Sequence, residues 1–483
     1  MAAAAAWTIA GTDPSGGAGI ASDLATFRDF GVRGGAIVAA VIAQNSRSVR
    51  AVRAVGPDLL RAQWDALREE GPPDAIKIGV LGDADTARAA AALLRDSDAR
   101  VVCDPVLASS GGAVFLDDIG RRVLLDEILP RVTLFAPNIP EAEALSGSPI
   151  RGPGDREAAG REFLRRGALA VAIKGGHAEG PYRQDLVMTA DERHWLTSPC
   201  LDTPHTHGTG CAFSSAAAAA IARGYDLDDA VVLAKTYVNQ GLRLGGAAGA
   251  AGRGSPAHAG WPSNPADLPW RVSAAAGGGD RFEFPRLEPF TARLWAVADN
   301  EAWLRQLVDA GVGLIQLRPA PGSMSAADLR RCMAYAWGRG SLVLLCDDWR
   351  AAVAAGLTGA LMGAAEVDDA AARALSAAGL CLVLTVSSLA DLARAAAWRP
   401  TAVVAGPVLS ASGEVGAIGL DRFRVLRALS AAPVVAAGGI TGERAGDVFA
   451  AGADGVALSS DLLRAPDPVA RAKEWLAALA RLG

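Results

Sequence analysis

The 483-residue sequence predicts an α/β protein with two folded units, an α/β sandwich on a mainly parallel sheet and then a (β/α)8 barrel. Three observations predict it. Short apolar runs alternate with alanine-rich helical stretches. A Gly-, Ala- and Pro-rich segment, residues 246–287, interrupts this alternation and predicts a linker. Eight evenly spaced apolar runs follow it, so we assign 1–245 and 288–483 to separate domains.

Each predicted strand is a short apolar run beside a helical stretch. Those of the first half are residues 7–10, 35–43, 75–80, 100–104, 132–136 and 169–173. Those of the second half are residues 293–298, 313–318, 342–347, 359–363, 381–387, 402–408, 433–438 and 455–460. Eight β/α repeats favour a closed barrel. A doubly wound open sheet is the alternative.

The composition excludes several classes of protein. With 47 basic and 52 acidic side chains, the net charge is −5. This charge gives no sign of the excess of basic residues that is typical of nucleic-acid-binding proteins. No apolar run is long enough to span a membrane, and residues 1–9 predict a first strand rather than a signal peptide. The six cysteines lack metal-binding spacing and indicate reduced thiols. We expect a cytoplasmic homo-oligomer that acts on small molecules.

Lysine and histidine are concentrated in the first half. The only lysines are Lys77, Lys174, Lys235 and Lys473, and no histidine follows His258. This shortage restricts the chemistry that the second half can carry out.

Two glycine-rich turns are candidate ligand sites. Gly11 begins a loop, residues 11–20, that leads from the first strand into a helix, where glycines allow a ligand to approach the backbone. A tight turn is the alternative. Residues 206–211 end in Gly208-Thr209-Gly210-Cys211 at another helix start, which presents free N–H groups to an anion and favours a thiolate. The alternative for Cys211 is a small buried filler.

Two further segments carry groups suited to phosphate chemistry. Asn138 and Glu141 stand three apart after a strand, as oxygen ligands for Mg²⁺ or its waters would, although a helix N-cap shows the same pattern. Lys174 ends another strand before Gly175-Gly176 and could reach ATP phosphates. A surface lysine is the alternative.

These motifs closely resemble the hydroxymethylpyrimidine/phosphomethylpyrimidine kinases of thiamine biosynthesis, which belong to the ribokinase-like kinases. The resemblance covers nearly all of residues 7–243. It is carried in order by residues 10–20 with Asp23, 43–47, 77–79, 104–106, 137–142, 174–177 and 206–211. One departure is visible, because Ser109 stands where the family often has lysine.

The resemblance implies ATP and Mg²⁺ as cofactors and assigns roles to individual residues. Gly208, Thr209 and Gly210 with Cys211 would form the anion hole, and Cys211 would be the catalytic base. The remaining roles are Gly11, Asp23 and Gln44 for the substrate, Lys174, Asn138 and Glu141 for ATP, and Asp104 and Glu141 for the metal. The expected reaction is in-line transfer of the γ-phosphoryl group to the pyrimidine's hydroxymethyl oxygen and then to the monophosphate. A pyridoxal-type substrate is the alternative.

The second half carries a candidate phosphate cup. Loops after strands 7 and 8 of such barrels commonly bind phosphate. Here Gly438 ends the seventh predicted strand, Gly439 follows it, and Ser460 ends the eighth. Ordinary barrel turns are the alternative.

This half resembles thiamine phosphate synthase across about 290–480, which would make it a user of the first half's product and of a thiazole phosphate. Gln316 and Arg318 match the pyrimidine-side Gln-x-Arg motif, and Asp347 and Glu366 fall at the metal positions. Ser387 and residues 406–408 match two further segments.

Several synthase positions are altered. Ala320, Leu361 and Glu414 replace an expected Lys, His and Lys, and Cys346 replaces an Asn. Two hypotheses follow: a synthase with remodelled diphosphate contacts, or a barrel that binds ligand without catalysis. A related thiazole tautomerase would need a catalytic histidine, which this half lacks.

Overall fold

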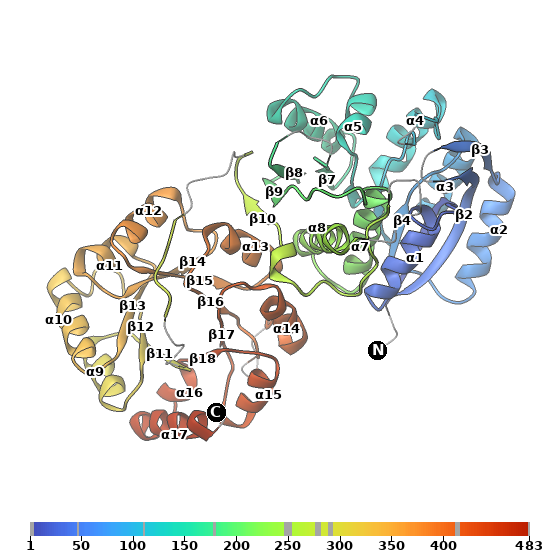
Figure 1. Ribbon diagram of the computed structural model, residues 1–483. Coiled ribbons are helices and arrows are strands. Elements are labelled where there is room, and N and C mark those ends of the chain that lie inside the picture. Colours follow the sequence, from blue (N-terminus) through green and yellow to red (C-terminus); the bar gives the residue numbers. More distant parts are fainter. Residues whose placement is uncertain are drawn as a thin grey trace. The chain divides into compact units, whose positions relative to one another are not determined.

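The computed structural model describes residues 4–45, 48–109, 112–176, 180–245, 254–275, 282–287, 293–410 and 416–481 (Figure 1). The chain forms two compact units, residues 1–277 and 278–483. Among the described residues, no helix is long and apolar enough to cross a membrane.

The first unit is built on a ten-stranded sheet in the order β10-β9-β8-β7-β6-β5-β4-β1-β2-β3. Its strands are β1 (Ala5–Gly11), β2 (Arg33–Gln44), β3 (Val49–Ala54), β4 (Ala75–Ile78), β5 (Arg100–Cys103), β6 (Leu134–Phe135), β7 (Ala170–Ile173), β8 (Tyr182–Met188), β9 (Arg193–Pro199) and β10 (Trp270–Val272). The six predicted strands are confirmed and pair in parallel. The four missed strands pair antiparallel at the two edges, where sequences such as YRQDLVM lack a continuous apolar run.

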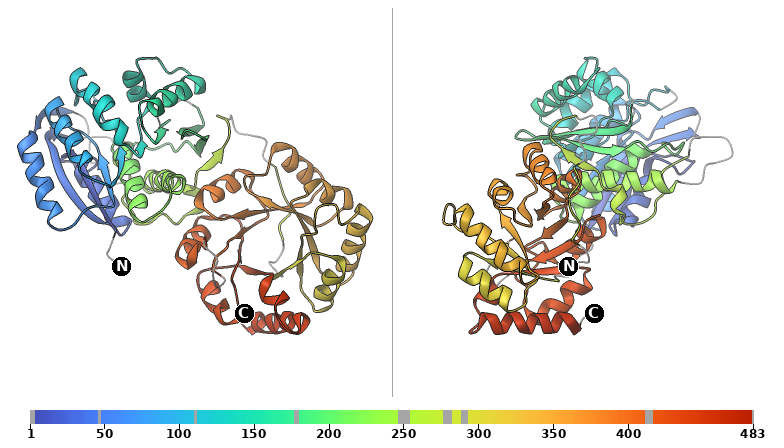
Figure 2. Two further views of the ribbon diagram at one scale, coloured as in Figure 1. Left: turned by 180° about the vertical axis from the view of Figure 1, so that it is seen from behind. Right: turned by 60° about the vertical axis from the view of Figure 1, so that its left-hand side comes forward.

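Helices cover both faces of this sheet (Figures 1 and 2). They are α1 (Gly19–Asp29), α2 (Pro57–Arg68), α3 (Ala84–Arg95), α4 (Asp118–Val123), α5 (Ile139–Ser146), α6 (Pro153–Arg165), α7 (Thr209–Ala222) and α8 (Leu227–Leu244), with short helical turns η1 (Leu124–Ile128), η2 (Leu129–Arg131) and η3 (Pro265–Asp267).

Alternation along β1 decides which helix meets which face, because successive side chains point to opposite sides. Trp7 packs edge-to-face on Trp64 of α2 with ring centroids 5.2 Å apart. Thr8 points the other way and donates a hydrogen bond to Asp23 of α1. One face is therefore an apolar core, and the other carries a polar network between the sheet and α1.

Part of the predicted linker, residues 254–275, belongs to the first unit. Here β10 pairs with β9, and η3 packs beside α8, where Arg243 donates two hydrogen bonds to Asp267 at 2.8 and 2.7 Å. The prediction of a linker over all of 246–287 is therefore wrong for these residues. Although rich in Gly and Pro, they contain Trp261, Leu268 and Trp270, which supply apolar surface to bury. Residues 246–253 lie outside the described residues.

The end of the predicted linker belongs to the second unit. Pro285 O accepts a hydrogen bond from Thr401 Oγ1 at 2.9 Å, and Glu283 O accepts one from Ser376 Oγ at 2.9 Å. Leu287 packs against the apolar interior of the barrel. Residues 282–287 are thus held by the elements that carry Ser376 and Thr401.

The second unit is a closed barrel of eight parallel strands, as predicted. Its strands are β11 (Leu294–Ala298), β12 (Leu314–Leu317), β13 (Leu342–Cys346), β14 (Gly359–Gly363), β15 (Cys381–Val386), β16 (Ala402–Ala405), β17 (Val434–Ala437) and β18 (Gly455–Leu458). Its helices are α9 (Glu301–Asp309), α10 (Ala326–Trp337), α11 (Trp349–Ala355), α12 (Asp369–Ala377), α13 (Leu389–Trp398), α14 (Gly419–Leu429), α15 (Ala445–Ala450), α16 (Ser460–Leu463) and α17 (Pro468–Arg481), with η4 (Gly442–Arg444) before α15. Inward residues such as Trp295, Leu344 and Val435 fill the barrel.

Replacing Arg243 with Ala tests whether η3 is part of the first fold. It leaves the buried Asp267 carboxylate unpaired, so we expect the free energy of unfolding to fall by about 2 kcal/mol or more. Arg88→Ala is the matched control, because it removes an exposed pair with Asp85 and should cost less than about 0.5 kcal/mol. Urea unfolding measures both variants, and equal effects would contradict the assignment.

Candidate functional site

The two predicted glycine-rich turns of the first unit touch one another. Gly208, with φ +84°, precedes α7, and a Cβ there would lie 1.9 Å from Gly17 O of the loop after β1. No side chain caps the first N–H groups of α7. These N–H groups and the positive end of the helix dipole can therefore receive an anion.

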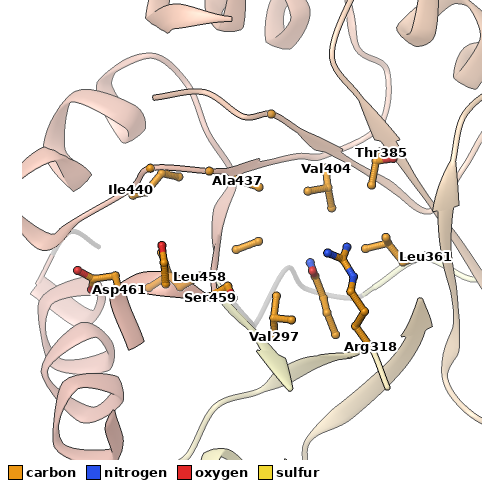
Figure 3. A pocket seen from close by; sticks show the side chains of 16 residues that line it. Val297, Arg318, Leu361, Thr385, Val404, Ala437, Ile440, Leu458, Ser459 and Asp461 are labelled. Atoms are coloured by element: carbon orange, nitrogen blue, oxygen red, sulfur yellow. The ribbon is translucent and has the colours of Figure 1, made fainter. Parts of the chain in front are cut away.

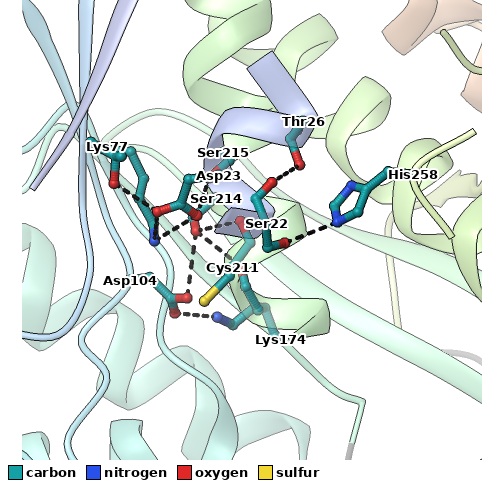
Figure 4. Close-up of polar contacts among 12 residues, drawn as sticks. Ser22, Asp23, Thr26, Lys77, Asp104, Lys174, Cys211, Ser214, Ser215 and His258 are labelled. Atoms are coloured by element: carbon teal, nitrogen blue, oxygen red, sulfur yellow. Dashed lines mark hydrogen bonds and ion pairs between the residues drawn. The ribbon is translucent and has the colours of Figure 1, made fainter. Parts of the chain in front are cut away.

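A lysine–carboxylate pair lies against this helix start. Lys174 Nζ, after β7, donates to Asp104 Oδ1, after β5, at 2.6 Å (Figure 4). A Cβ on Gly210 would lie 3.1 Å from Asp104 Oδ2 and 3.2 Å from Lys174 Nζ. Glycine at position 210 thus lets both charged groups approach the backbone of α7. The alternative of a surface lysine is wrong for Lys174, since most of its side chain is buried.

Asp23 lies beneath the site instead of in contact with it. Its carboxylate is fully buried and accepts hydrogen bonds from Lys77 Nζ at 2.9 and 3.0 Å, Thr8 Oγ1 at 2.7 Å and Ser215 Oγ at 2.6 Å. The expectation that Asp23 binds substrate is therefore not met in this structure. Lys77 is fully buried as well, and its charge requires a buried counterion.

The structure corrects the expected state of Cys211. Burial raises the pKa of its thiol to about 11, and the carboxylates of Asp23 and Asp104 act in the same direction. Lys77 and the N–H group of Gly19 oppose this rise. Without ligand the group is a neutral thiol at pH 7, because burial outweighs the helix start that favoured a thiolate.

Asn138 and Glu141 form the N-cap that was left open as the alternative. Glu141 N–H donates to Asn138 Oδ1 at 2.9 Å, and Asn138 N–H donates to Glu141 Oε2 at 2.8 Å. Burial raises the pKa of Glu141 to about 7, nearby Asp104 raises it further, and Lys174 opposes both. The helix cap therefore holds a carboxyl group in the same cluster as Asp104 and Lys174.

This cluster is compatible with Mg²⁺, which usually keeps several waters and takes one or two carboxylates beside phosphates. Asp104 and Glu141 could supply those carboxylates. Across the described part of the chain, no three His, Cys, Asp or Glu side chains form a metal-holding group.

Sequence reasoning assigned no role to one further contact in the site. His207 Nε2 lies 3.0 Å from Asp13 Oδ2 and links the two glycine-rich turns. Hydrogen bonds from His207 and Ser15 lower the pKa of Asp13 to about 2 despite its burial. Both residues stand in motifs noted above, but only the fold shows that these motifs meet.

The remaining kinase-half candidates are placed less tightly. Gln44 ends β2 and is half-buried, while a Cβ on Gly11 would lie 2.7 Å from Ile42 Cδ1, so glycine there permits close strand packing. His177 and residues 110–111 lie outside the described residues.

The barrel has a cavity of about 190 Å³ at the carboxyl ends of its strands (Figure 3). Gln316 and Arg318 from β12 and the residue after it line the cavity, together with Gly438, Gly439 and Ser460 after β17 and β18. The structure thus brings together the two predicted groups of ligand-binding residues. Gln316 is 3% exposed and its Nε2 has no hydrogen-bond partner, so a polar group of a ligand could satisfy it.

The predicted metal ligands of the barrel are not among the residues that line this cavity. Asp347 is exposed after β13 with φ +65°, and Glu366 Oε2 accepts a hydrogen bond from Gly363 N–H at 3.1 Å. Leu361 lines the cavity at the position of the expected histidine. Glu414 lies outside the described residues. The metal role of Asp347 and Glu366 stays a prediction.

A family model described as phosphomethylpyrimidine kinase matches residues 13–256. The chain belongs to the phosphomethylpyrimidine kinase family. A second family model, described as thiamine monophosphate synthase, matches residues 290–462.

Curated relatives of this kinase family align with the first half of the chain. A hydroxymethylpyrimidine/phosphomethylpyrimidine kinase of Bacillus subtilis is 38% identical over 239 residues, 49% of this chain and 88% of the relative. One from Escherichia coli is 39% identical over 239 residues, 49% of this chain and 90% of the relative. The thiamine biosynthesis bifunctional protein ThiED of Geobacter sulfurreducens is 39% identical over 238 residues, 49% of each chain.

Solved structures confirm the ribokinase-like fold of the kinase unit. Pyridoxal kinase from Staphylococcus aureus superposes with a TM-score of 0.51 at 28% identity, covering 56% of this chain and 98% of that one. Its complex with ADP gives a TM-score of 0.50 at 29% identity, covering 53% and 94%.

The raised pKa of Cys211 predicts slow alkylation by iodoacetamide at pH 7. The rate should climb with pH towards 11, because only the thiolate reacts. Peptide mapping by mass spectrometry follows Cys211 separately, with the buried Cys103 as the unreactive control. A pH-independent rate would contradict the neutral thiol.

Proposed function

We propose that the first unit transfers the γ-phosphoryl group of ATP to the hydroxymethyl oxygen of 4-amino-5-hydroxymethyl-2-methylpyrimidine, and then a second phosphoryl group to the resulting monophosphate. The observation that carries this proposal is the Lys174–Asp104 pair at the uncapped start of α7, beside Cys211. Family membership and relatives named for this reaction support it.

The groups around α7 would stabilise the charge that moves during transfer. The N–H groups that follow Gly208 would receive the γ-phosphoryl oxygens, and Lys174 would neutralise part of their charge. Asp104 and Glu141 would hold Mg²⁺, which would supply positive charge to neutralise the phosphate groups. Positioning and electrostatics would therefore supply most of the rate enhancement.

Cys211 is the proposed acceptor of the hydroxyl proton. A neutral thiol must first ionise, and the buried ammonium of Lys77 favours its thiolate. The thiolate fraction rises with pH up to about 11, so the rate should rise with pH as well.

Replacing Cys211 with Ala should lower kcat for both transfers by about 10²-fold or more and remove the alkaline rise in the pH–rate profile. Cys211→Ser keeps the size of the side chain but not the thiol, and serves as the matched variant. Steady-state assays with each pyrimidine substrate, from pH 6 to 10, measure both effects. Near-normal turnover of Cys211→Ala would remove this residue from the proton-transfer role.

Pyridoxal is the second candidate substrate, because the superposed structures are pyridoxal kinases, one of them solved with pyridoxal bound. We favour the pyrimidine because the curated relatives that align over the whole unit carry that name. The two compounds compete in one assay, and the ratio of their kcat/KM values decides between them.

For the barrel we propose binding of a phosphate ester with a heterocycle, as in the resemblance to thiamine monophosphate synthase. The unpartnered Gln316 amide and the Gly438, Gly439 and Ser460 loops share one cavity, where Arg318 points inward (Figure 3). Ala320 and Leu361 leave the site without the Lys and His expected for a diphosphate. We therefore propose ligand binding without catalysis.

Titration of the full chain with thiazole phosphate tests this proposal. Gln316→Leu and Ser460→Ala should each weaken binding by about 1 kcal/mol or more, through loss of one hydrogen bond. Ser376→Ala, which alters a contact with Glu283, is the control. Formation of thiamine phosphate from the pyrimidine diphosphate and thiazole phosphate would show that the barrel is catalytic. Absence of thiazole phosphate binding would overturn the proposal that the barrel binds this ligand.

A further inference from the structure

Residues 254–261 lie directly on the glycine-rich turns of the kinase site. His207 N–H donates to Gly254 O at 3.2 Å. Ser255 covers Gly17 so closely that a Cβ on Gly17 would lie 2.3 Å from Ser255 Oγ. Since Gly17 in turn contacts Gly208, this segment packs on both turns that form the anion site. We refer to residues 254–261 as the strap.

The strap is fixed to the helices beside the site at two further points. Ala257 N–H donates to Gly241 O of α8 at 2.9 Å, and a Cβ on Gly241 would lie 2.8 Å from Pro256 Cβ. At the far end, the ring of Trp261 lies 4.8 Å from that of Phe30, with the guanidinium of Arg223 5.0 Å above it.

His258 joins the strap to α1 and α8 by two hydrogen bonds. Tyr237 OH donates its single proton to Asp29 Oδ2 at 2.9 Å, so it must accept from His258 Nδ1 at 2.8 Å. That assignment leaves Nε2 of a neutral ring as the acceptor for Ser22 Oγ at 3.3 Å. Asp29 also accepts from Gly260 N–H at 3.0 Å, which holds the strap a second time.

The contact with Ser22 reaches the reacting groups in three steps. Ser22 precedes Asp23 on α1, Asp23 holds Lys77, and Lys77 lies beside Cys211 (Figure 4). The strap therefore touches the site on two sides, at the turn that carries His207 and at the helix that carries Asp23.

We propose that the strap positions the anion-binding turn and α1 for phosphoryl transfer, and that His258 is its positioning residue. This inference rests on the proposed kinase function. The composition predicts this segment as a linker. The proposal instead gives the segment a role in the active site. His258 would act through its contacts with Ser22 and Tyr237.

The test compares full-length His258→Leu with His258→Gln and with Gln63→Leu. Leucine removes both hydrogen bonds of His258, whereas glutamine can restore one. Gln63 is the matched control because it also makes two hydrogen bonds between elements, to Val38 N and O, on α2 away from the strap. Steady-state assays give kcat and KM for ATP and pyrimidine, and thermal unfolding gives Tm.

We expect His258→Leu to lower kcat by about tenfold or more with KM for ATP little changed, because misplaced groups slow the chemical step. His258→Gln should recover part of the loss, and Gln63→Leu should lower Tm without changing kcat. Ser22→Ala combined with His258→Leu should be no worse than His258→Leu alone, as expected for residues on one path. Unchanged kcat in His258→Leu, or an equal loss in Gln63→Leu, would overturn the proposal.

Hydrogen exchange separates failure of this proposal from failure of the kinase assignment. The amides of residues 206–211 should exchange faster in His258→Leu than in Gln63→Leu, whether or not the protein phosphorylates a pyrimidine. Inactivity of the wild-type chain on both pyrimidines would overturn the kinase assignment. The exchange rates would still test whether the strap positions the turn at residues 206–211.

Discussion

The buried ion pair between Lys77 and Asp23 is the constraint on which the kinase site depends. A lysine in a central strand, with no exposed surface, is tolerated only with a carboxylate and further hydrogen bonds around it. Thr8 and Ser215 complete that shell, so β1, β4, α1 and α7 are held at one point. Loss of one partner from such a pair typically costs about 3–5 kcal/mol. The positions of these four elements around the kinase site therefore depend on this buried ion pair.

The same charges set the chemistry of the site. Lys77, Lys174, Asp23 and Asp104 lie around the Cys211 thiol, and Glu141 lies beside Lys174 and Asp104. Burial strengthens the interactions among these groups. Lys174 is matched to Asp104 and Lys77 to Asp23, so the ligand-free cluster is close to neutral. Anionic phosphates would upset that balance unless cations accompany them. Among the described residues that line the barrel cavity, Arg318 carries a positive charge and no lysine is present.

How far the sequence predicts the structure depends on how local the signal is. Apolar runs fix all eight barrel strands and six strands of the sheet, because buried parallel strands need continuous apolar residues. The edge strands β8 and β9 carry too many polar residues to show that pattern. Gln316 and Ser460 are predicted from local motifs and do share a cavity. The pairing of Lys77 with Asp23 joins residues 54 positions apart, and the contact of His258 with Ser22 joins residues 236 positions apart, so no local pattern reveals them.

The two ends of the predicted linker belong to different folds. β10 ends at Val272 within the kinase sheet, while Glu283 and Pro285 already bond to the barrel. If the two units were expressed as separate chains, a division between residues 276 and 281 would keep the described elements of each unit on one chain. Division at the composition boundary near residue 245 would leave the strap and the last strand of the kinase on the wrong polypeptide.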